Sequence, residues 1–332
     1  MSDTISSEVT RSSEETRSRE EARLNYQKAE RKRRRVAIMR HVILIVWALI
    51  IMFPIYWMIQ TSFKDAGEWV TWPPNWIPQD PTLKNYQQIF ASNVQDTGIA
   101  RDATEQPFNI WGALRDSVVI CTVSALIALL MGTFLAYSIS RFNVGGDRFR
   151  HSVLIIRMIP PIVIAIPLLM YYAIMIPLAT DTAFGVRISL FDTRIGMSLL
   201  YIAITLPFVI WMMLSFIDEV PYSLEHAARI MGAGRMYTLR RVVLPLVASG
   251  MVVTFLFVFI LNWAEFLLAL TMTHPEVTTL PVLLNKFQSA SEGRLYGPQA
   301  AIGTIITIPV VILGILIQKH LIKGFSFGTI RK

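Results

Sequence analysis

Six long apolar runs, each near the length that crosses a lipid bilayer, constrain the fold of this chain more than any other feature. A helix needs about 20 apolar residues to cross about 30 Å of hydrocarbon, and inside one such run only a helix satisfies its own backbone hydrogen bonds. Of the 332 residues, 53% are hydrophobic and 16% charged, which excludes an ordinary soluble domain. The sequence therefore predicts an all-α membrane protein with six transmembrane helices. The runs cover residues 40–60, 116–139, 152–176, 196–217, 247–271 and 299–320.

Prolines lie inside several of these runs, and we expect them to kink the helices without ending them. The third run holds Pro160, Pro161 and Pro167, and Pro177 follows it as a candidate outer boundary. A proline lacks a backbone donor, but neighbouring helices in a bundle can satisfy the freed carbonyl. Bent spans in a helical bundle are therefore expected.

Basic residues between the runs predict the orientation of the chain. Arginines are abundant between the second and third runs and between the fourth and fifth, and cations also follow the sixth run. The other connections have fewer cations, which acidic residues roughly balance. By the positive-inside rule both termini and the loop at 221–245 lie in the cytoplasm. We therefore expect a multi-pass membrane protein with cytoplasmic termini.

The first 35 residues differ from the rest of the chain. They are polar and end in the basic run at 31–35, directly before the first apolar run. We interpret residues 1–35 as a disordered cytoplasmic extension, with a helix from about Ser18 as the alternative, and residues 36–332 as the six-helix domain. The basic run holds the first span at the membrane surface, so nucleic acid is not an expected partner despite the net charge of +8.

The loop at 221–245 is predicted to hold a short amphipathic helix. Ser223 is a candidate N-cap, and Glu225 and Arg229 have the i, i+4 spacing of a solvated ion pair. Gly232 is expected to end the helix in the left-handed conformation. A narrow apolar stripe comprises Leu224, Ala227, Ala228 and Met231. Its small residues permit close approach, which predicts a surface that docks into a groove of a partner.

The sequence of this loop matches a known pattern at Ala227-Ala228, Gly232-Ala233, Val242 and Leu244-Pro245. At these positions it resembles the cytoplasmic EAA loop of ABC importer permeases. The resemblance implies a coupling helix that sits in a cleft of the ATP-hydrolysing subunit, and an ordinary interhelical loop is the alternative. His226 stands where the family has glutamate, and Met231 where it has aspartate. The implied coupling residues are Glu225, His226, Ala227, Ala228, Met231, Gly232 and Ala233.

Other segments are similar to maltose-type carbohydrate permeases, from about residue 40 to the C-terminus. They are residues 61–64, 136–142, 263–266 and 323–328, and Ala264 replaces the usual asparagine of Trp-Asn-Glu-Phe. The resemblance implies the type I ABC importer permease fold in the bacterial inner membrane. It also implies a second homologous permease, two ATP-binding subunits that hold ATP and Mg, and an extracytoplasmic solute-binding protein. No cofactor is expected in this chain.

Polar and aromatic residues inside the runs are candidates for a substrate pathway. An ionisable group in the membrane is costly and suggests a function. Arg157 either extends to the inner interface or lines the pathway, and Glu265 either bonds neighbouring helices or contacts a sugar. Aromatic rings stack on sugars, although packing is their commoner role. The candidates are Arg157, Tyr171, Tyr172, Trp211, Asn262 and Glu265.

Two loops on the opposite side from 221–245 are long. Tryptophans and prolines in the first, residues 61–114, suit the membrane–water interface. In maltose-type importers the loop that corresponds to residues 273–298 reaches into the binding protein, and a passive connector is the alternative here. The candidate contact residues are Ser289, Ser291, Glu292 and Arg294.

The sequence lacks several motifs that enzymes use to bind phosphate or metal ions. It has no phosphate-binding loop ending in Gly-Lys-Ser/Thr, no His-Glu-x-x-His spacing, and one cysteine, Cys121. We therefore expect no enzyme activity in this chain. The sequence predicts the permease subunit of an ATP-driven importer for a sugar, polyol or sugar derivative. A secondary transporter or channel for a small polar solute is the alternative, although no buried acidic relay or inverted repeat supports it.

Overall fold

The computed structural model describes residues 2–90, 110–156, 159–273, 276–289 and 293–325. The chain divides into two units, Met1–Ile59 and Gln60–Lys332, and the second holds almost all of the packed structure. The described part is almost entirely helical, as predicted. Its helices are α1 (Ser2–Ser62), α2 (Lys84–Phe90), α3 (Ile110–Phe142), α4 (Gly146–Ile156), α5 (Pro161–Met170), α6 (Ile176–Phe184), α7 (Arg194–Asp218), α8 (Tyr222–Ile230), α9 (Arg235–Thr238), α10 (Leu244–Leu246), α11 (Ala248–Trp263), α12 (Leu267–Met272), α13 (Leu280–Asn285) and α14 (Tyr296–Phe325).

The first unit is a single helix, which differs from the disorder expected over residues 1–35. α1 is helical from Ser2, and Pro54 is its first proline. The sequence before Pro54 contains no glycine, and Glu, Arg, Lys and Ala, which favour helix, are frequent in it. Low hydrophobicity predicted disorder, whereas helix propensity decides the local conformation. The first compact unit ends at Ile59 and the second begins at Gln60, both within α1.

The described residues contain five helices long and apolar enough to cross a membrane, and six if one bent pair forms a single span. This agrees with the six runs. The bent pair is Arg235–Leu246 and Ala248–Trp263, whose axes differ by 74°. Pro245 lies in the short α10 at the bend, where a proline is tolerated in the first turn. The other candidates are Lys32–Ser62, Ile110–Phe142, Ile162–Phe184, Arg194–Asp218 and Tyr296–Gln318.

The third span is displaced from its predicted position at 152–176. α4 ends at Ile156, the backbone at Pro160 is extended, and α5 begins at Pro161. Two successive prolines cannot continue a helix, but a proline suits a first turn. A π-helical turn, Tyr171–Met175, then joins α5 to α6, and Pro177 lies in the first turn of α6 instead of marking an outer end. The candidate span is therefore Ile162–Phe184.

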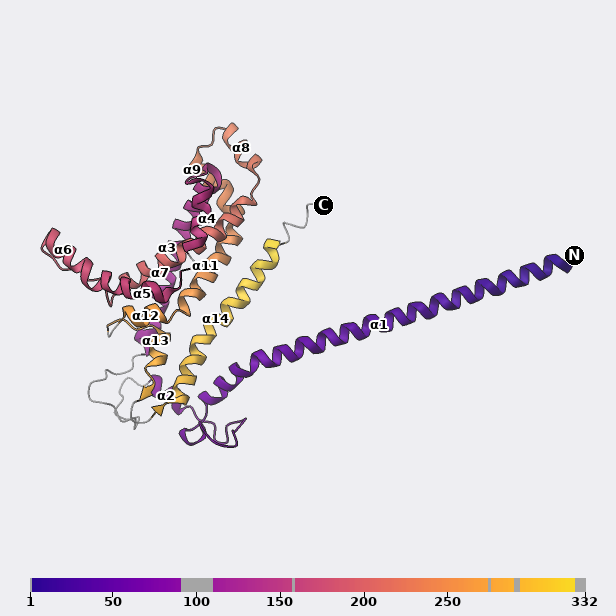
Figure 1. Ribbon diagram of the computed structural model, residues 1–332, viewed down its shortest axis with the longest axis horizontal. Helices are drawn as coiled ribbons and strands as arrows, with labels where there is room; N and C mark the ends of the chain where they lie inside the picture. Colours follow the sequence, from indigo (N-terminus) through magenta and orange to yellow (C-terminus); the bar gives the residue numbers. More distant parts are fainter. Residues whose placement is uncertain (1, 91–109, 157–158, 274–275, 290–292, 326–332) are drawn as a thin grey trace. The chain divides into compact units, whose positions relative to one another are not determined.

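The core of the second unit forms where α3 packs along α7, with α11 beside both (Figure 1). A row of small residues on α3 allows this approach. Ala125, Ala128 and Ala136 are fully buried, and a Cβ on Gly132 would lie 2.5 Å from Val209 of α7. Close backbone contact between small residues is how helices associate in lipid, which offers no hydrophobic drive between them.

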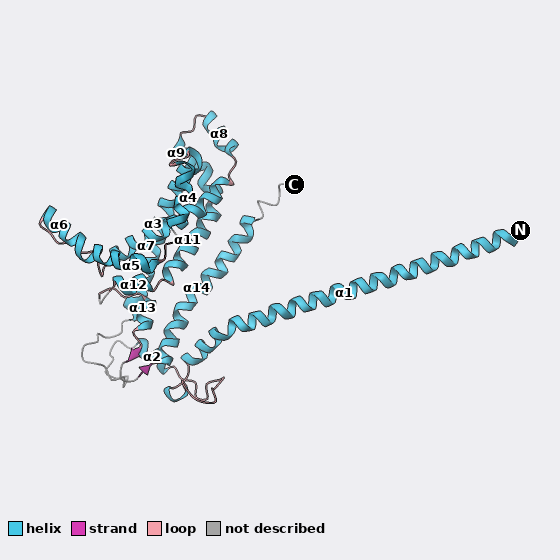
Figure 2. Ribbon diagram, viewed as in Figure 1, coloured by secondary structure: helices cyan, strands magenta, loops and turns pink. Residues whose placement is uncertain are grey.

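Away from α8, the chain forms short elements. β1 (Gln288–Ser289) and β2 (Gly293–Arg294) form an antiparallel hairpin, drawn in magenta in Figure 2. The buried Lys64 donates from Nζ to the Asn75 carbonyl at 2.6 Å. Burial lowers the pKa of the Lys64 ammonium, while the Glu68 carboxylate acts to raise it. The loop after α1 is thus a packed structure and not a loose connector.

Candidate functional site

The short helix predicted within the loop at 221–245 is α8. The sequence predicted the carboxyl end of this helix correctly but not its amino end. The carboxyl end is as predicted: Gly232 has φ +86°, and its N–H donates to the Arg229 carbonyl at 2.9 Å. The Ala233 N–H donates to the Ala228 carbonyl at 3.0 Å, which completes a Schellman motif. The amino end corrects the prediction, because Pro221 and not Ser223 is the N-cap residue.

The inward face of α8 carries a carboxylate that the sequence analysis took to be solvated. Glu225 is completely buried, and Arg141 at the end of α3 donates from Nε to its Oε1 at 2.5 Å. The Tyr137 hydroxyl donates to Glu225 Oε2 at 3.1 Å. The expected Glu225–Arg229 pair is therefore replaced by a buried pair with α3. Ala228, one turn further, is also buried and does not belong to an exposed docking stripe.

The outward face of α8 is apolar and exposed. Ile230 and Met231 are 82% and 81% exposed, which is extreme for residues of this size. Leu224 and Ala227 are exposed beside them, and so is His226. Ile230 lies at the edge of the i, i+3, i+4, i+7 stripe, so the stripe did not predict its place on this face. We call Leu224, Ala227, Ile230 and Met231 the outward face of α8.

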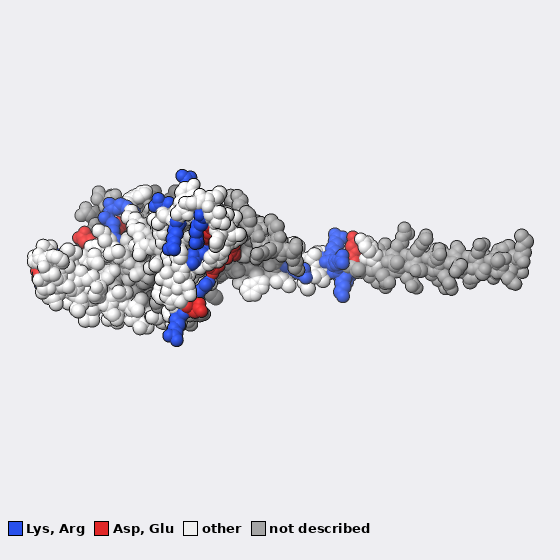
Figure 3. Space-filling model, turned by 90° about the horizontal axis from the view of Figure 1, so that it is seen from above, with Lys and Arg blue, Asp and Glu red and all other residues white. Residues whose placement is uncertain are grey.

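Arginines surround this end of the second unit. Figure 3 views the molecule from the α8 side, and blue Lys and Arg side chains gather over α8 and α9. The described exposed arginines at this end are Arg148, Arg150, Arg229, Arg235, Arg240 and Arg241. An apolar helix face ringed by cations suits a partner protein with an apolar groove and acidic rim.

Glu265 and Asn262, two candidates for the substrate pathway, bond to the chain itself. The half-buried Glu265 accepts from the Leu268 and Ala269 N–H groups at 2.7 and 3.0 Å, at the amino end of α12. The Tyr201 hydroxyl of α7 donates to the same carboxylate at 3.0 Å. Asn262 donates to Ser124 Oγ at 2.9 Å. These groups join α3, α7, α11 and α12, and no sequence signal pointed to Tyr201.

The aromatic candidates lie in two separate pairs. The rings of Tyr171 and Tyr172 are 6.2 Å apart in the π-helical turn, and Trp211 on α7 is 6.2 Å from Phe208. Tyr172 is buried, whereas Tyr171 and Trp211 are exposed. Arg157 lies outside the described residues. The structure therefore leaves Tyr171 and Trp211 available to a ligand or a partner.

The candidate contact loop at 273–298 is anchored at its start. Asp192 accepts from the Glu276 and Val277 N–H groups at 2.9 and 3.0 Å, and Ser117 accepts from the Leu280 N–H at 2.8 Å. Among the four predicted contact residues, Ser289 lies in β1 and Arg294 in β2, while Ser291 and Glu292 fall outside the described residues.

These features define an all-α integral membrane protein with a short, exposed apolar helix face between two spans. The family described as "Binding-protein-dependent transport system inner membrane component" matches residues 128–327, from the middle of α3 past α8 to the end of α14. The chain belongs to this family, and it is the permease subunit of an ABC transporter.

Its relatives include named sugar permeases. The chain is 28% identical over 283 residues to the diacetylchitobiose uptake system permease protein DasC of Streptomyces coelicolor, covering 85% of this chain and 92% of the relative. It is 29% identical to the trehalose transport system permease protein SugB of Mycobacterium tuberculosis, covering 84% and 92%. A solved bacterial ABC transporter that imports the acidic polysaccharide alginate has the same fold, with a TM-score of 0.63 and 19% identity over 86% of this chain and 96% of that one.

Proposed function

We propose that this permease moves a sugar, a polyol or a sugar derivative into the cytoplasm, driven by ATP that separate subunits hydrolyse. The outward face of α8 is the observation that carries the proposal. Two large apolar side chains, Ile230 and Met231, are more than 80% exposed on a helix anchored to the transmembrane core by Glu225. Large exposed apolar patches usually mark interaction sites, so we infer that a partner protein covers this one.

The partner at α8 is an ATP-binding subunit, two of which serve this chain and a second homologous permease. The sequence contains no phosphate-binding loop, so ATP and Mg are held by those subunits. Their cleft receives Leu224, Ala227, Ile230 and Met231, with His226 at the rim. ATP-driven closure of the two subunits then displaces α8 and changes which side of the membrane the substrate path faces.

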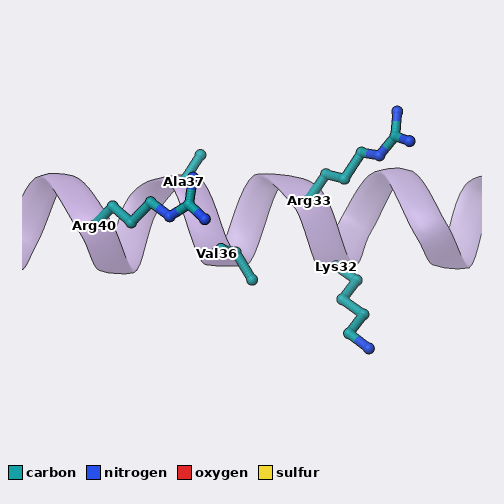
Figure 4. A pocket seen from close by; sticks show the side chains of 5 residues that line it. All are labelled: Lys32, Arg33, Val36, Ala37 and Arg40. Carbon is teal, nitrogen blue, oxygen red and sulfur yellow. The ribbon is translucent and has the colours of Figure 1, made fainter.

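The orientation that this requires places α8 and both termini in the cytoplasm. Exposed arginines surround α8, and cations favour the cytoplasmic side. On α1, Lys32, Arg33 and Arg40 project around Val36 and Ala37 next to the first apolar run (Figure 4). Charges at this position hold the start of the span at the inner membrane surface.

On the opposite side the hairpin of β1 and β2 and its flanking loop face the solute-binding protein. The start of this loop is held in place, because Asp192 and Ser117 accept hydrogen bonds from its backbone N–H groups. Within the membrane, Tyr171 and Trp211 are the exposed aromatic candidates for stacking on a sugar ring. The sugar class rests on the relatives named for diacetylchitobiose and trehalose uptake.

The test uses the complete complex in proteoliposomes with a panel of labelled sugars and polyols. Ile230→Asp places a charge in the apolar cleft, and we expect it to lower both recovery of the ATP-binding subunit and uptake about ten-fold. Val144→Asp is the matched control, because Val144 is also exposed, at 52%, between α3 and α4. Normal uptake by Ile230→Asp would refute docking at α8. Sugar uptake by the chain without any ATP-binding subunit would instead support the secondary transporter.

A further inference from the structure

We infer that the buried pair of Arg141 and Glu225 clamps α8 to the ends of α3 and α7, so that α8 and these helices move as one rigid body. Movement of α8 would then reach the transmembrane helices without being absorbed by bending of the loop. The inference rests on the proposed coupling function, and it assigns to Arg141 a positioning role that its place in the sequence did not predict.

The contacts of Arg141 use its guanidinium almost completely. Besides the Glu225 bond, Nη2 donates to the carbonyls of Ile217 and Val220, both at 2.9 Å, and Nη1 donates to Ser140 Oγ at 3.0 Å. These carbonyls lie at the end of α7, where helical carbonyls lose their partners. One planar side chain on α3 thereby holds the end of α7 and the start of α8 together.

Two tyrosines add further contacts between α8 and α3 around the Arg141–Glu225 pair. The Tyr222 hydroxyl donates to the Ser140 carbonyl at 2.9 Å, and its ring lies 4.2 Å below the Arg141 guanidinium. Tyr137, one turn before Arg141, donates to the other oxygen of Glu225. The carboxylate is therefore bonded on both oxygens to α3, which fixes its position and its direction.

Burial makes this arrangement rigid. The side chains of Arg141 and Glu225 are 1% and 0% exposed. If α8 moved away from α3, it would leave an unpaired charge in a medium where water cannot replace the lost partner. Separation is thus far less favourable than joint movement, which a solvated pair would not enforce.

The backbone around α8 would not supply this rigidity by itself. Gly232 and Gly234 follow the helix, and among the described residues a Cβ built on either would meet nothing within 4 Å beyond its chain neighbours. The nearby Arg150–Asp218 pair is close to half exposed, so water can replace each partner. Of these two ion pairs, the Arg141 network is therefore the one whose burial holds α8 to α3.

The test measures distances in the complete complex. Spin labels go on Leu135→Cys of α3 and Ser223→Cys of α8, both exposed positions, with the buried Cys121 replaced by Ala. With Arg141 intact, we expect one narrow label-to-label distance that is the same in the nucleotide-free and ATP-bound states. Arg141→Gln is expected to broaden that distance and to lower sugar uptake per ATP hydrolysed about ten-fold, a size typical of substitutions in coupling networks.

Two further variants keep the test decisive if Arg141→Gln does not fold. Tyr137→Phe removes one donor to Glu225 but preserves packing, and we expect about a two-fold loss of uptake per ATP. Arg187→Gln removes the cation of an exposed ion pair with Asp181, away from α8, and we expect both distance and uptake to be unchanged. A narrow, state-independent distance with normal uptake per ATP in Arg141→Gln, or in Tyr137→Phe if the former does not fold, would overturn the clamp. The proposed function fails separately if the unaltered complex shows no ATP-driven uptake.

Discussion

Two glutamates, Glu225 within the short helix α8 and Glu265 just before the short helix α12, have environments opposite to those their sequences suggest. Glu225 lies in a polar loop, yet it is completely buried and paired with Arg141. Glu265 lies in an apolar run, yet it is only half-buried and accepts from the neutral donors of α12 and Tyr201. The position of a glutamate in a polar loop or in an apolar run therefore did not predict how deeply it is buried. The packing of the surrounding helices determined the burial of each carboxylate.

The two environments show that the chain breaks before α8 and before α12 are stabilised in different ways. The break before α8 depends on a charge pair, which is costly to disrupt when one member is removed. The break before α12 depends on hydrogen bonds from neutral groups, each worth about 0.5–1.5 kcal/mol, or somewhat more to a charged acceptor. The two breaks should accordingly respond very differently to removal of their carboxylates.

The largest effect is expected for Glu225→Ala. The substitution leaves the Arg141 guanidinium buried without its carboxylate, which costs about 3–5 kcal/mol. Thermal unfolding of the full-length chain in detergent micelles should show a strongly lowered midpoint. Glu219→Ala is the control, because Glu219 is an exposed carboxylate of the same loop. Equal midpoints for the two variants would show that the buried pair does not stabilise this break.

A smaller loss is expected for Glu265→Ala, which removes the acceptor of the Leu268 and Ala269 N–H groups. Loss of such a cap costs about 1–2 kcal/mol. Glu265→Gln keeps one carbonyl oxygen for these donors and should lose about half as much. The same unfolding measurement compares them. If Glu265→Ala proved more destabilising than Glu225→Ala, the contrast between the two breaks would be reversed.

Gly232→Ala should destabilise the end of α8 by about 1 kcal/mol, because φ is +86° there and a Cβ is strained in that conformation. Gly234→Ala is a matched control, since Gly234 has φ −69° and equally open surroundings. The free energy of unfolding of Gly234→Ala should differ from that of the unaltered chain by less than about 0.5 kcal/mol. Identical losses in the two variants would remove the left-handed turn as the cause.

The smallest effect is expected for Arg150→Gln. Its pair with Asp218 is close to half exposed on both sides, and exposed pairs contribute about 0–1 kcal/mol. Unfolding midpoints at low and high salt should differ little from those of the unaltered chain. If Arg150→Gln lowered the unfolding midpoint as much as Glu225→Ala does, burial would not explain why the two ion pairs at this end contribute differently to stability.

Properties that consecutive residues encode could be predicted from the amino-acid sequence. Run length and hydrophobicity predicted an all-α protein with six spans, Gly232 predicted the end of α8, and the loop pattern predicted the permease family. Each of these depends on residues within one or two helical turns or one apolar run, so local patterns were sufficient. The displaced third span shows the limit, because the paired prolines at Pro160 ended a helix that hydrophobicity alone continued.

Which face of α8 turns inward depends on packing between helices that are distant in the sequence. Arg141 and Glu225 are 84 residues apart, and the packing of α3 against α7 brings them together. That contact turned Glu225 and Ala228 inward, left Ile230 exposed, and made a buried clamp from what looked like a solvated i, i+4 pair. A helical period predicts which residues share a face, but the partner that buries that face is chosen by packing between helices distant in sequence.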